Sequence, residues 1–267
     1  LKIKVIWNGP TTETDYARQI QILDSMVAQK VDGIAIAACE RQALVGPVER
    51  AIKAGIPVTV FDSGLDSDQY LSFVATNNYE GGQLAARQMA EFLAAKPAAK
   101  VAILQHAPGS QSTMDREKGF EDTVAQSFAG RLQIVARQYG MSDRSKSRAA
   151  AENFLTAHPD LDGIFCSTEP SATGAALALK SRELAGKIKF VAFDSSAGMV
   201  EDLRAGTIHA LVVQDPFRMG FDAVKTLHDK LAGRMVPKRI DLSARVILPT
   251  DLDKPEVQRL LAPEKPR

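Results

Sequence analysis

The chain repeats one pattern in its two halves: an apolar strand, a helix-like segment, and a second apolar strand that ends on Asp-Ser. Residues 31–36 (VDGIAI) are followed about thirty residues later by 58–63 (VTVFDS), and 161–166 (LDGIFC) are followed by 190–195 (FVAFDS). Strands that are apolar throughout are typical of parallel sheets covered on both faces, and such sheets bind ligands at their carboxyl edge. The repeat therefore predicts two similar lobes whose Asp-ended strands face each other across a cleft.

Strands and helices alternate along the whole chain. The apolar spacing of Tyr16, Ile20, Leu23 and Val27, for example, predicts a helix over 15–30. The other predicted helices are 42–54, 79–93, 114–127, 147–157, 172–182, 199–205 and 217–231. The predicted strands are 3–7, 34–38, 58–61, 73–76, 100–105, 133–139, 163–166, 189–193, 209–213, 240–243 and 245–248. This alternation predicts an α/β fold with two Rossmann-like lobes, each a parallel sheet flanked by helices.

Composition limits the classes of function. The 267 residues are 45% hydrophobic and 24% charged, as in ordinary globular proteins long enough for two cores. The net charge of +1, without long runs of one sign, argues against a nucleic-acid-binding surface. Cys39 and Cys166 are interpreted as small buried apolar residues, and the four scattered histidines give no metal-ligand spacing.

The common catalytic motifs are missing from the sequence. No G-x-G-x-x-G follows a strand, and no phosphate-binding G-x-x-x-x-G-K-[ST] occurs. The G-x-S-x-G elbow and the H-E-x-x-H zinc motif are also missing. This pattern favours a binding protein that is not an enzyme and uses neither cofactor nor metal.

Five short motifs occur in a specific order. They are 56–63 (IPVTVFDS), 74–82 (VATNNYEGG), 116–120 (REKGF), 190–194 (FVAFD), and Val213-Gln214 ahead of Pro216. Together they resemble the type I periplasmic sugar-binding proteins of the ribose-binding kind, over essentially the whole chain. The resemblance implies a periplasmic monomer that binds a small sugar or polyol in its cleft by hinge closure. It also implies delivery of that ligand to a membrane ABC permease, with no nucleic acid as partner.

The same fold occurs in the effector-binding cores of lactose-repressor-type transcription regulators, and this function is the alternative. A signal peptide upstream of Leu1 would indicate the first function, and a DNA-binding helix pair the second. A Rossmann-like nucleotide enzyme is a third hypothesis, which the missing phosphate-binding loop disfavours.

The resemblance also implies the extent of each lobe. The amino-terminal lobe is expected to comprise 1–106 and 216–248, and the carboxy-terminal lobe 107–215 and 249–267. The chain is expected to cross between lobes near 106–108, 214–216 and 248–250, which together would form the hinge.

The first lobe is expected to lack one unit. Compared with the family, strand 3–7 and helix 15–30 look like the second strand and second helix. The missing first strand would lie between 3–7 and 34–38, and without it two rows of backbone groups would be unpaired. We therefore expect the chain to be part of a longer precursor.

Five residues match positions at which the family contacts its ligand. Asp62 and Asp194 are carboxylates that accept hydrogen bonds from hydroxyls, and Arg116 offers a rigid fork of donors. Asn77 and Gln214 each offer a donor and an acceptor. Other roles are open for several of them: a strand-end Asp can cap a helix, Asn77 can cap the helix expected at 79–93, and Arg116 can lie on a solvated helix face.

Three further residues adjoin these positions. Thr168 and Glu169 occupy the family's next contact position, where an amide followed by Asp is more usual. Ser63 stands where the ribose-specific pattern has Arg, so the match does not single out ribose. A pentose, a hexose, a polyol or a related small polar molecule all fit this set of side chains.

Overall fold

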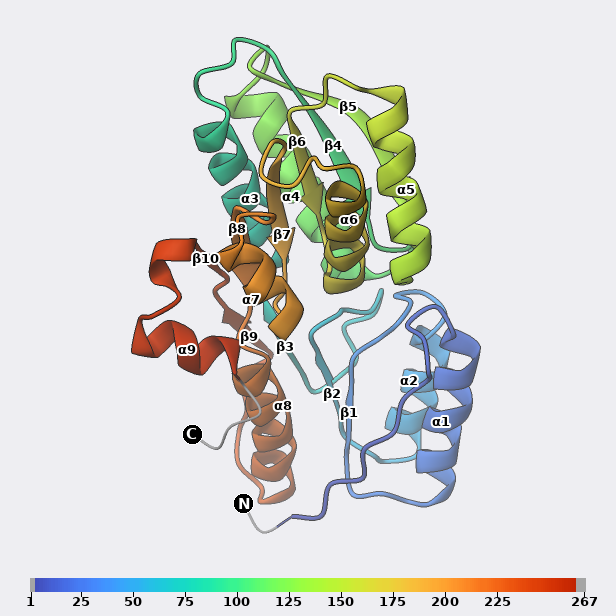
Figure 1. Ribbon diagram of the computed structural model, residues 1–267. Coiled ribbons are helices and arrows are strands. Elements are labelled where there is room, and N and C mark those ends of the chain that lie inside the picture. The colour runs from blue at the N-terminus through green and yellow to red at the C-terminus, as the bar shows by residue number, and fades with distance from the viewer. Residues whose placement is uncertain (1–2, 263–267) are drawn as a thin grey trace. The chain divides into compact units, whose positions relative to one another are not determined.

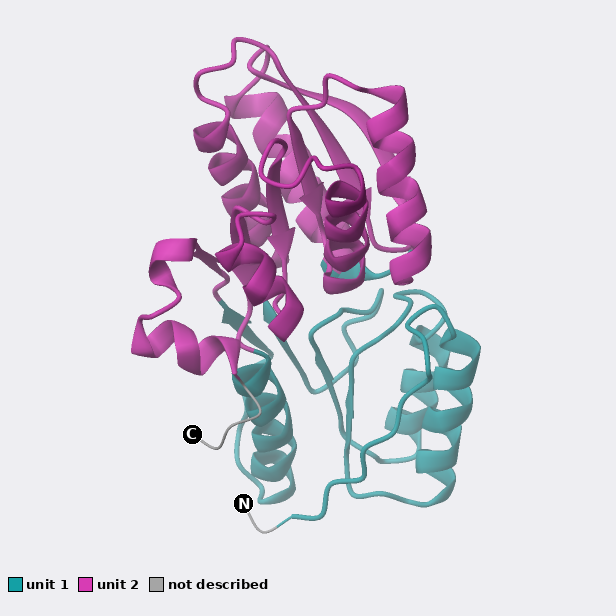
Figure 2. Ribbon diagram, in the orientation of Figure 1, with its two compact units in different colours: residues 1–76, 109–112, 216–242 teal, residues 77–108, 113–215, 243–267 magenta. Residues whose placement is uncertain are grey.

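The computed structural model describes residues 3–262, which form two compact units (Figures 1 and 2). Unit 1 comprises the residues up to Thr76, Gly109–Ser112 and Pro216–Leu242. Unit 2 comprises Asn77–Pro108, Thr113–Asp215 and the residues from Ser243 onward. The outermost ends of the expected lobes, residues 1–2 and 263–267, lie outside the described part.

Unit 1 contains a four-stranded parallel sheet in the order β1-β2-β3-β9. Its strands are β1 (Ile34–Ile36), β2 (Val58–Phe61), β3 (Ser72–Thr76) and β9 (Arg239–Leu242). Helices α1 (Tyr16–Ala28) and α2 (Val45–Lys53) cover one face, and α8 (Pro216–Leu231) packs on the other (Figure 1). The core centres on Leu44, Val48, Val58 and Val60, all at most 1% exposed.

Unit 2 contains a six-stranded sheet in the order β10-β8-β7-β6-β4-β5, parallel except for β10. Its strands are β4 (Ala99–Gln105), β5 (Leu132–Tyr139), β6 (Gly163–Cys166), β7 (Lys189–Phe193), β8 (Ala210–Val213) and β10 (Arg245–Ile247). Its helices are α3 (Asn78–Phe92), α4 (Gln111–Ser127), α5 (Arg144–Ala157), α6 (Glu169–Ser181), α7 (Ala197–Arg204) and α9 (Pro255–Leu261), with the 3-10 turn η1 (Pro249–Asp251) before α9.

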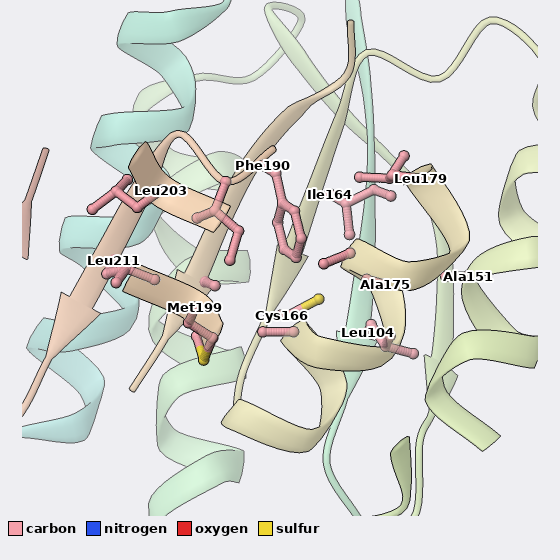
Figure 3. Packing of buried hydrophobic residues seen from close by; sticks show 14 of the residues in the cluster. Leu104, Ala151, Ile164, Cys166, Ala175, Leu179, Phe190, Met199, Leu203 and Leu211 are labelled. Carbon is pink, nitrogen blue, oxygen red and sulfur yellow. The ribbon is translucent and has the colours of Figure 1, made fainter. Parts of the chain in front are cut away.

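Neighbouring residues of the central strands enter two different cores. Ile103 and Phe165 pack with α3 and α4 on one face, whereas Leu104 and Ile164 pack with α5, α6, α7 and α9 on the other. Figure 3 shows the second core, in which Cys166 lies among aliphatic and aromatic side chains. Because both faces are covered, successive residues in the middle of these strands are apolar, as the sequence predicted.

Both cysteines are free thiols. Complete burial raises the pKa of Cys166 well above its ordinary value. Partial burial, together with the carboxylates of Glu13 and Asp15, raises the pKa of Cys39 to about 11. Neither thiol is activated. Cys166 is buried, as the interpretation of both residues as buried and apolar requires, whereas Cys39 is only half-buried.

The predicted helices and strands have observed bounds within three residues of those expected, with one exception. The strand expected at 3–7 is wrong: these residues form no strand, and Trp7 is 85% exposed. A strand needs a neighbour to pair its backbone groups, and β1 is bonded only to β2 in the described sheet. The sequence reading also missed η1 and α9.

The units divide the chain at other points than expected. Residues 77–106 were expected in the amino-terminal lobe, but β4 pairs with β5 and β6, and α3 packs on the same sheet. The chain therefore passes from one unit to the other at Thr76–Asn77, Asp215–Pro216 and Leu242–Ser243, and the short segment Gly109–Ser112 clusters with unit 1. The second of these passages lies within residues 214–216.

Candidate functional site

Asp62 and Asp194 have the same unusual backbone geometry, one in each unit. Each follows a central strand and has a positive φ, 60° for Asp62 and 71° for Asp194. Each N–H donates to a carbonyl of the next strand, Val74 O or Val212 O, at 2.9 Å. A left-handed conformation costs free energy for residues other than glycine, and such strain is concentrated at functional sites. The duplicated sequence pattern thus corresponds to a duplicated local structure.

Arg116 lies at the centre of a polar cluster in unit 2. The residue is only 3% exposed, so it does not lie on a solvated helix face. Its Nε donates to Asn78 Oδ1 at 2.8 Å, and its Nη1 donates to Ser167 O at 3.0 Å. The guanidinium also lies 3.9 Å from the ring centroid of Phe193 and 3.5 Å from Asp194 Oδ2. These contacts fix the plane of the guanidinium.

Two glycines explain why Arg116 lies so close to α3. A Cβ added to Gly82 would lie 2.0 Å from Arg116 O, and one added to Gly119 would lie 2.1 Å from Tyr79 O. Because α3 and α4 contact each other through their backbones, side chains at these positions would force them apart. The motifs 74–82 and 116–120 are therefore the two sides of one helix contact, which brings Asn78 to Arg116.

Asp194 joins the cluster through both carboxylate oxygens. Its Oδ1 accepts from Gln214 Nε2 at 2.7 Å, and its Oδ2 accepts from the Glu169 N–H at 3.2 Å. Gln214 Oε1 is buried and has no hydrogen-bond partner within residues 3–262. An unpartnered buried amide oxygen is costly, and a ligand hydroxyl is a donor that could satisfy it. Three of the predicted residues, Arg116, Asp194 and Gln214, thus come together.

Asn77 is outside this cluster. Its Oδ1 accepts from the Glu80 N–H at 3.2 Å, and its Nδ2 donates to Glu80 Oε2 at 3.1 Å, so it caps α3. The amide that reaches Arg116 belongs to Asn78, a residue the sequence reading missed. The spacing of Asn77 and Glu80 is that of a helix cap, and this signal could have directed attention to the second asparagine.

Thr168 and Glu169 begin α6 beside the cluster. Thr168 Oγ1 lies 3.1 Å from Ser171 Oγ at the start of the helix. The Glu169 carboxylate pairs with Arg144 at 2.9 Å and accepts from Thr173 Oγ1 at 2.9 Å. Glu169 therefore contacts Asp194 through its backbone, while its carboxylate is engaged elsewhere.

Ser63 adjoins Asp62 in unit 1. The residue is 4% exposed, its N–H donates to Phe61 O at 2.7 Å, and its Oγ accepts from the Ser112 N–H at 3.3 Å. A short turn after β2 therefore holds Asp62 at the carboxyl edge of the sheet. Ser63 supports the turn that presents Asp62.

Between residues 3 and 262, no group of three or more His, Cys, Asp or Glu is arranged to hold a metal ion. None of the helices in this part of the chain combines the length and the apolar character needed to cross a membrane.

Comparison with known proteins gives consistent similarities. The family model described as "Periplasmic binding protein domain" matches residues 1–235. The Ribose import binding protein RbsB of Bacillus subtilis (strain 168) is 31% identical over 229 residues, covering 85% of this chain and 72% of the relative. The D-ribose/D-allose-binding protein of Pseudomonas aeruginosa is 29% identical over 239 residues, covering 87% of this chain and 73% of the relative.

Solved structures agree with this similarity. A carbohydrate transporter solute binding protein from Agrobacterium radiobacter, in complex with D-arabinose, has a TM-score of 0.91 and 34% identity, covering 95% of this chain and 86% of the other. An ABC transporter solute binding protein from Agrobacterium vitis, with bound D-fucose, has a TM-score of 0.92 and 34% identity, covering 97% and 89%.

Proposed function

Because the chain belongs to the periplasmic binding protein domain family, in which it is a non-enzymatic, sugar-binding component of an ABC importer, we propose that its ligand is a single pentose or hexose. The ligand is held by Asp62 from unit 1 and by Arg116, Asp194 and Gln214 from unit 2, together with Asn78. The protein acts in the periplasm as a monomer and transfers the sugar to a membrane ABC permease.

The observation that supports this proposal best is the cluster of Arg116, Asp194 and Gln214. It combines a fixed fork of donors, a carboxylate on a strained backbone, and an amide whose Oε1 lacks a partner in residues 3–262. Sugar hydroxyls both donate and accept, so they can satisfy each of these groups. Hydrogen bonds to charged groups contribute about 1.5–3 kcal/mol each, and three or four suffice for micromolar binding.

The names of similar proteins define the sugars to test. D-ribose and D-allose appear in the names of relatives, and D-arabinose and D-fucose are bound in similar solved structures. The resemblance puts Ser63 where the ribose-specific pattern has Arg. We therefore propose that this protein prefers another member of the group to D-ribose.

Closure of the two units on the sugar is the proposed mechanism. The chain passes between the units at Thr76–Asn77, at Asp215–Pro216, at Leu242–Ser243 and on either side of Gly109–Ser112, and these passages act as the hinge. A ligand that bonds to both units binds the closed form more tightly than the open form, so it shifts the population toward closure. The permease then recognises the closed form.

A thermal-shift screen tests the sugar proposal directly. D-ribose, D-allose, D-arabinose, D-fucose and two polyols, xylitol and sorbitol, are added to the purified protein at increasing concentration. A sugar at 100 times its Kd adds about 2.7 kcal/mol to the free energy of unfolding, which raises the Tm by several degrees. A folded protein whose Tm responds to none of the four sugars would contradict the proposal.

A further inference from the structure

Glu117 is a buried carboxylate to which the proposed binding mode gives no role. The residue is 5% exposed and follows Arg116 on α4. Its Oε2 accepts from Gln105 Nε2 at 2.9 Å, and its Oε1 accepts from the His106 N–H at 3.1 Å and from Ser167 Oγ at 2.8 Å. A carboxylate in such an environment is costly unless hydrogen bonds compensate for its burial. Here all three donors lie at the ends of β4 and β6.

Ser167 connects this carboxylate to Arg116. Its hydroxyl donates to Glu117, and its carbonyl accepts from Arg116 Nη1 at 3.0 Å. One residue therefore carries both the bond that Glu117 receives and the bond that orients the guanidinium. Loss of the first bond frees the loop after β6 to shift, and the second bond shifts with it.

We propose that Glu117 is a positioning residue for the ligand. By holding Ser167 and the end of β4, it keeps the Arg116 guanidinium in the plane that meets the sugar, without itself contacting the sugar. This inference rests on the proposed function, because it assigns to Arg116 a role in binding.

Several charged or titratable groups surround Glu117. His106 at the end of β4 interacts with it electrostatically, and so does Tyr139 at the end of β5. On its own helix, Arg116 precedes Glu117 and Glu121 lies one turn further on. Glu121 forms an exposed ion pair with Arg137 at 2.6 Å. Its charge also contributes to raising the pKa of Tyr139.

Protonation of Glu117 should weaken its hydrogen bonding to Ser167, and with it the positioning of Arg116. Burial raises the pKa of Glu117 above its ordinary value, although the bonds from His106, Ser167 and Gln105 act in the opposite direction. On acidification this carboxyl takes up a proton at a higher pH than an exposed glutamate does. One of its oxygens then becomes a donor, so it can no longer accept all three bonds. Sugar affinity should fall together with this protonation.

The test compares Glu117→Gln with the matched control Glu121→Gln. Calorimetric titration at pH 7.5 uses whichever of D-ribose, D-allose, D-arabinose and D-fucose binds the unaltered protein most tightly. We expect Glu117→Gln to raise the Kd about tenfold, as for a charged hydrogen bond lost close to the ligand, and the control to leave it unchanged. Between pH 7.5 and pH 4.5 the affinity of the unaltered protein should fall toward that of Glu117→Gln, whose own pH dependence should be weaker.

A double-mutant cycle with Arg116→Lys separates positioning from general stability. If Glu117 acts through the guanidinium, Glu117→Gln should change the Kd much less in the Arg116→Lys background than in the unaltered protein. Should Glu117→Gln fail to fold, Ser167→Ala removes the connecting hydroxyl alone and should raise the Kd in the same direction.

The outcomes are distinct. An unchanged Kd for folded Glu117→Gln, or for Ser167→Ala where the first variant does not fold, overturns the positioning role and leaves the proposed function intact. Additive effects in the cycle also overturn it. If the unaltered protein binds none of the four sugars, the proposed function fails and the positioning role fails with it.

Discussion

Asn77 and Asn78 are adjacent in the sequence but have different hydrogen-bonding roles. The first caps α3 through the Glu80 N–H, and the second accepts from Arg116 Nε. Asn77→Ala should lower the free energy of unfolding by about 1 kcal/mol, as expected for a lost helix cap, and leave the sugar Kd of the folded protein unchanged. Asn78→Ala should raise the Kd. Chemical denaturation and calorimetric titration of both variants test this division, and a Kd raised more by Asn77→Ala than by Asn78→Ala would reverse it.

Asp194 combines a strained backbone with a carboxylate, and substitutions can separate the two. Asp194→Gly should abolish sugar binding and lower the free energy of unfolding, because the buried Arg116 loses its carboxylate partner, but it should add no backbone strain, since glycine adopts a positive φ freely. Asp194→Ala should abolish binding too, but should be less stable than the glycine variant by about 1 kcal/mol. The measurements are urea denaturation and titration with the same sugar. Equal stability of the two variants would indicate that the backbone of Asp194 is not strained.

At the residue scale, most of the residues proposed to bind the sugar were already candidates in the sequence. Asp62 and Asp194 came from the repeat, and Arg116 and Gln214 came from the family resemblance. Asn78 was missed because a shift of one residue decides which amide caps the helix. The engagement of Glu169 could not be foreseen, since its partner Arg144 is 25 residues away in the sequence and the pairing depends on how α5 and α6 pack.

At the element scale, the crossing of α3 and α4 is the contact most sensitive to side-chain volume. Gly82→Ala would set a methyl group 2.0 Å from Arg116 O, so the helices must separate. We expect a loss of about 1–3 kcal/mol in the free energy of unfolding, together with weaker sugar binding because Arg116 moves. The control is Gly220→Ala in α8, where nothing lies within 4 Å and alanine should stabilise the helix slightly. Thermal denaturation of both variants tests whether the α3–α4 contact is this close. Similar Tm values would contradict it.

The local sequence pattern predicted helices and strands well where each strand has neighbouring strands to pair with. The central strands of unit 2 are mostly apolar because helices cover both faces, and their expected bounds agree closely with those observed. Residues 3–7 have equally apolar character but form no strand. Periodicity and propensity describe what a segment can do, whereas pairing depends on the segments next to it.

At the scale of the whole molecule, the proposal requires one sugar to contact both units. Hydrogen exchange with and without the preferred sugar tests this requirement. We expect slower exchange after both Asp-ended strands, at residues 61–63 and at residues 193–195, because a bound ligand stabilises the closed form. The helix α5 serves as an internal control that should exchange at the same rate in both samples. Protection confined to unit 2 would exclude Asp62 from the site.

The boundaries of the units could not be predicted from the sequence. The strand β4 is an apolar run that either sheet could accept, and its partner β6 lies about sixty residues further along the chain. Only the pairing of β4 with β5 and β6 assigns this strand to unit 2. The expected crossing near 214–216 came from the resemblance, which identified residues on both sides of it.

The pairing of β3 with β9 has a consequence for how the chain folds during its synthesis. Phe73 lies opposite Arg239, so the sheet of unit 1 gains its last strand from a segment that the ribosome makes more than 160 residues later. The α8 helix that covers one face of this sheet is also made late. Contacts so distant in sequence form slowly, and a growing chain exposes unpaired strand edges until they do. The sheet of unit 1 therefore stays incomplete until most of the chain has been synthesised, and its unpaired strand edges are exposed to aggregation until then.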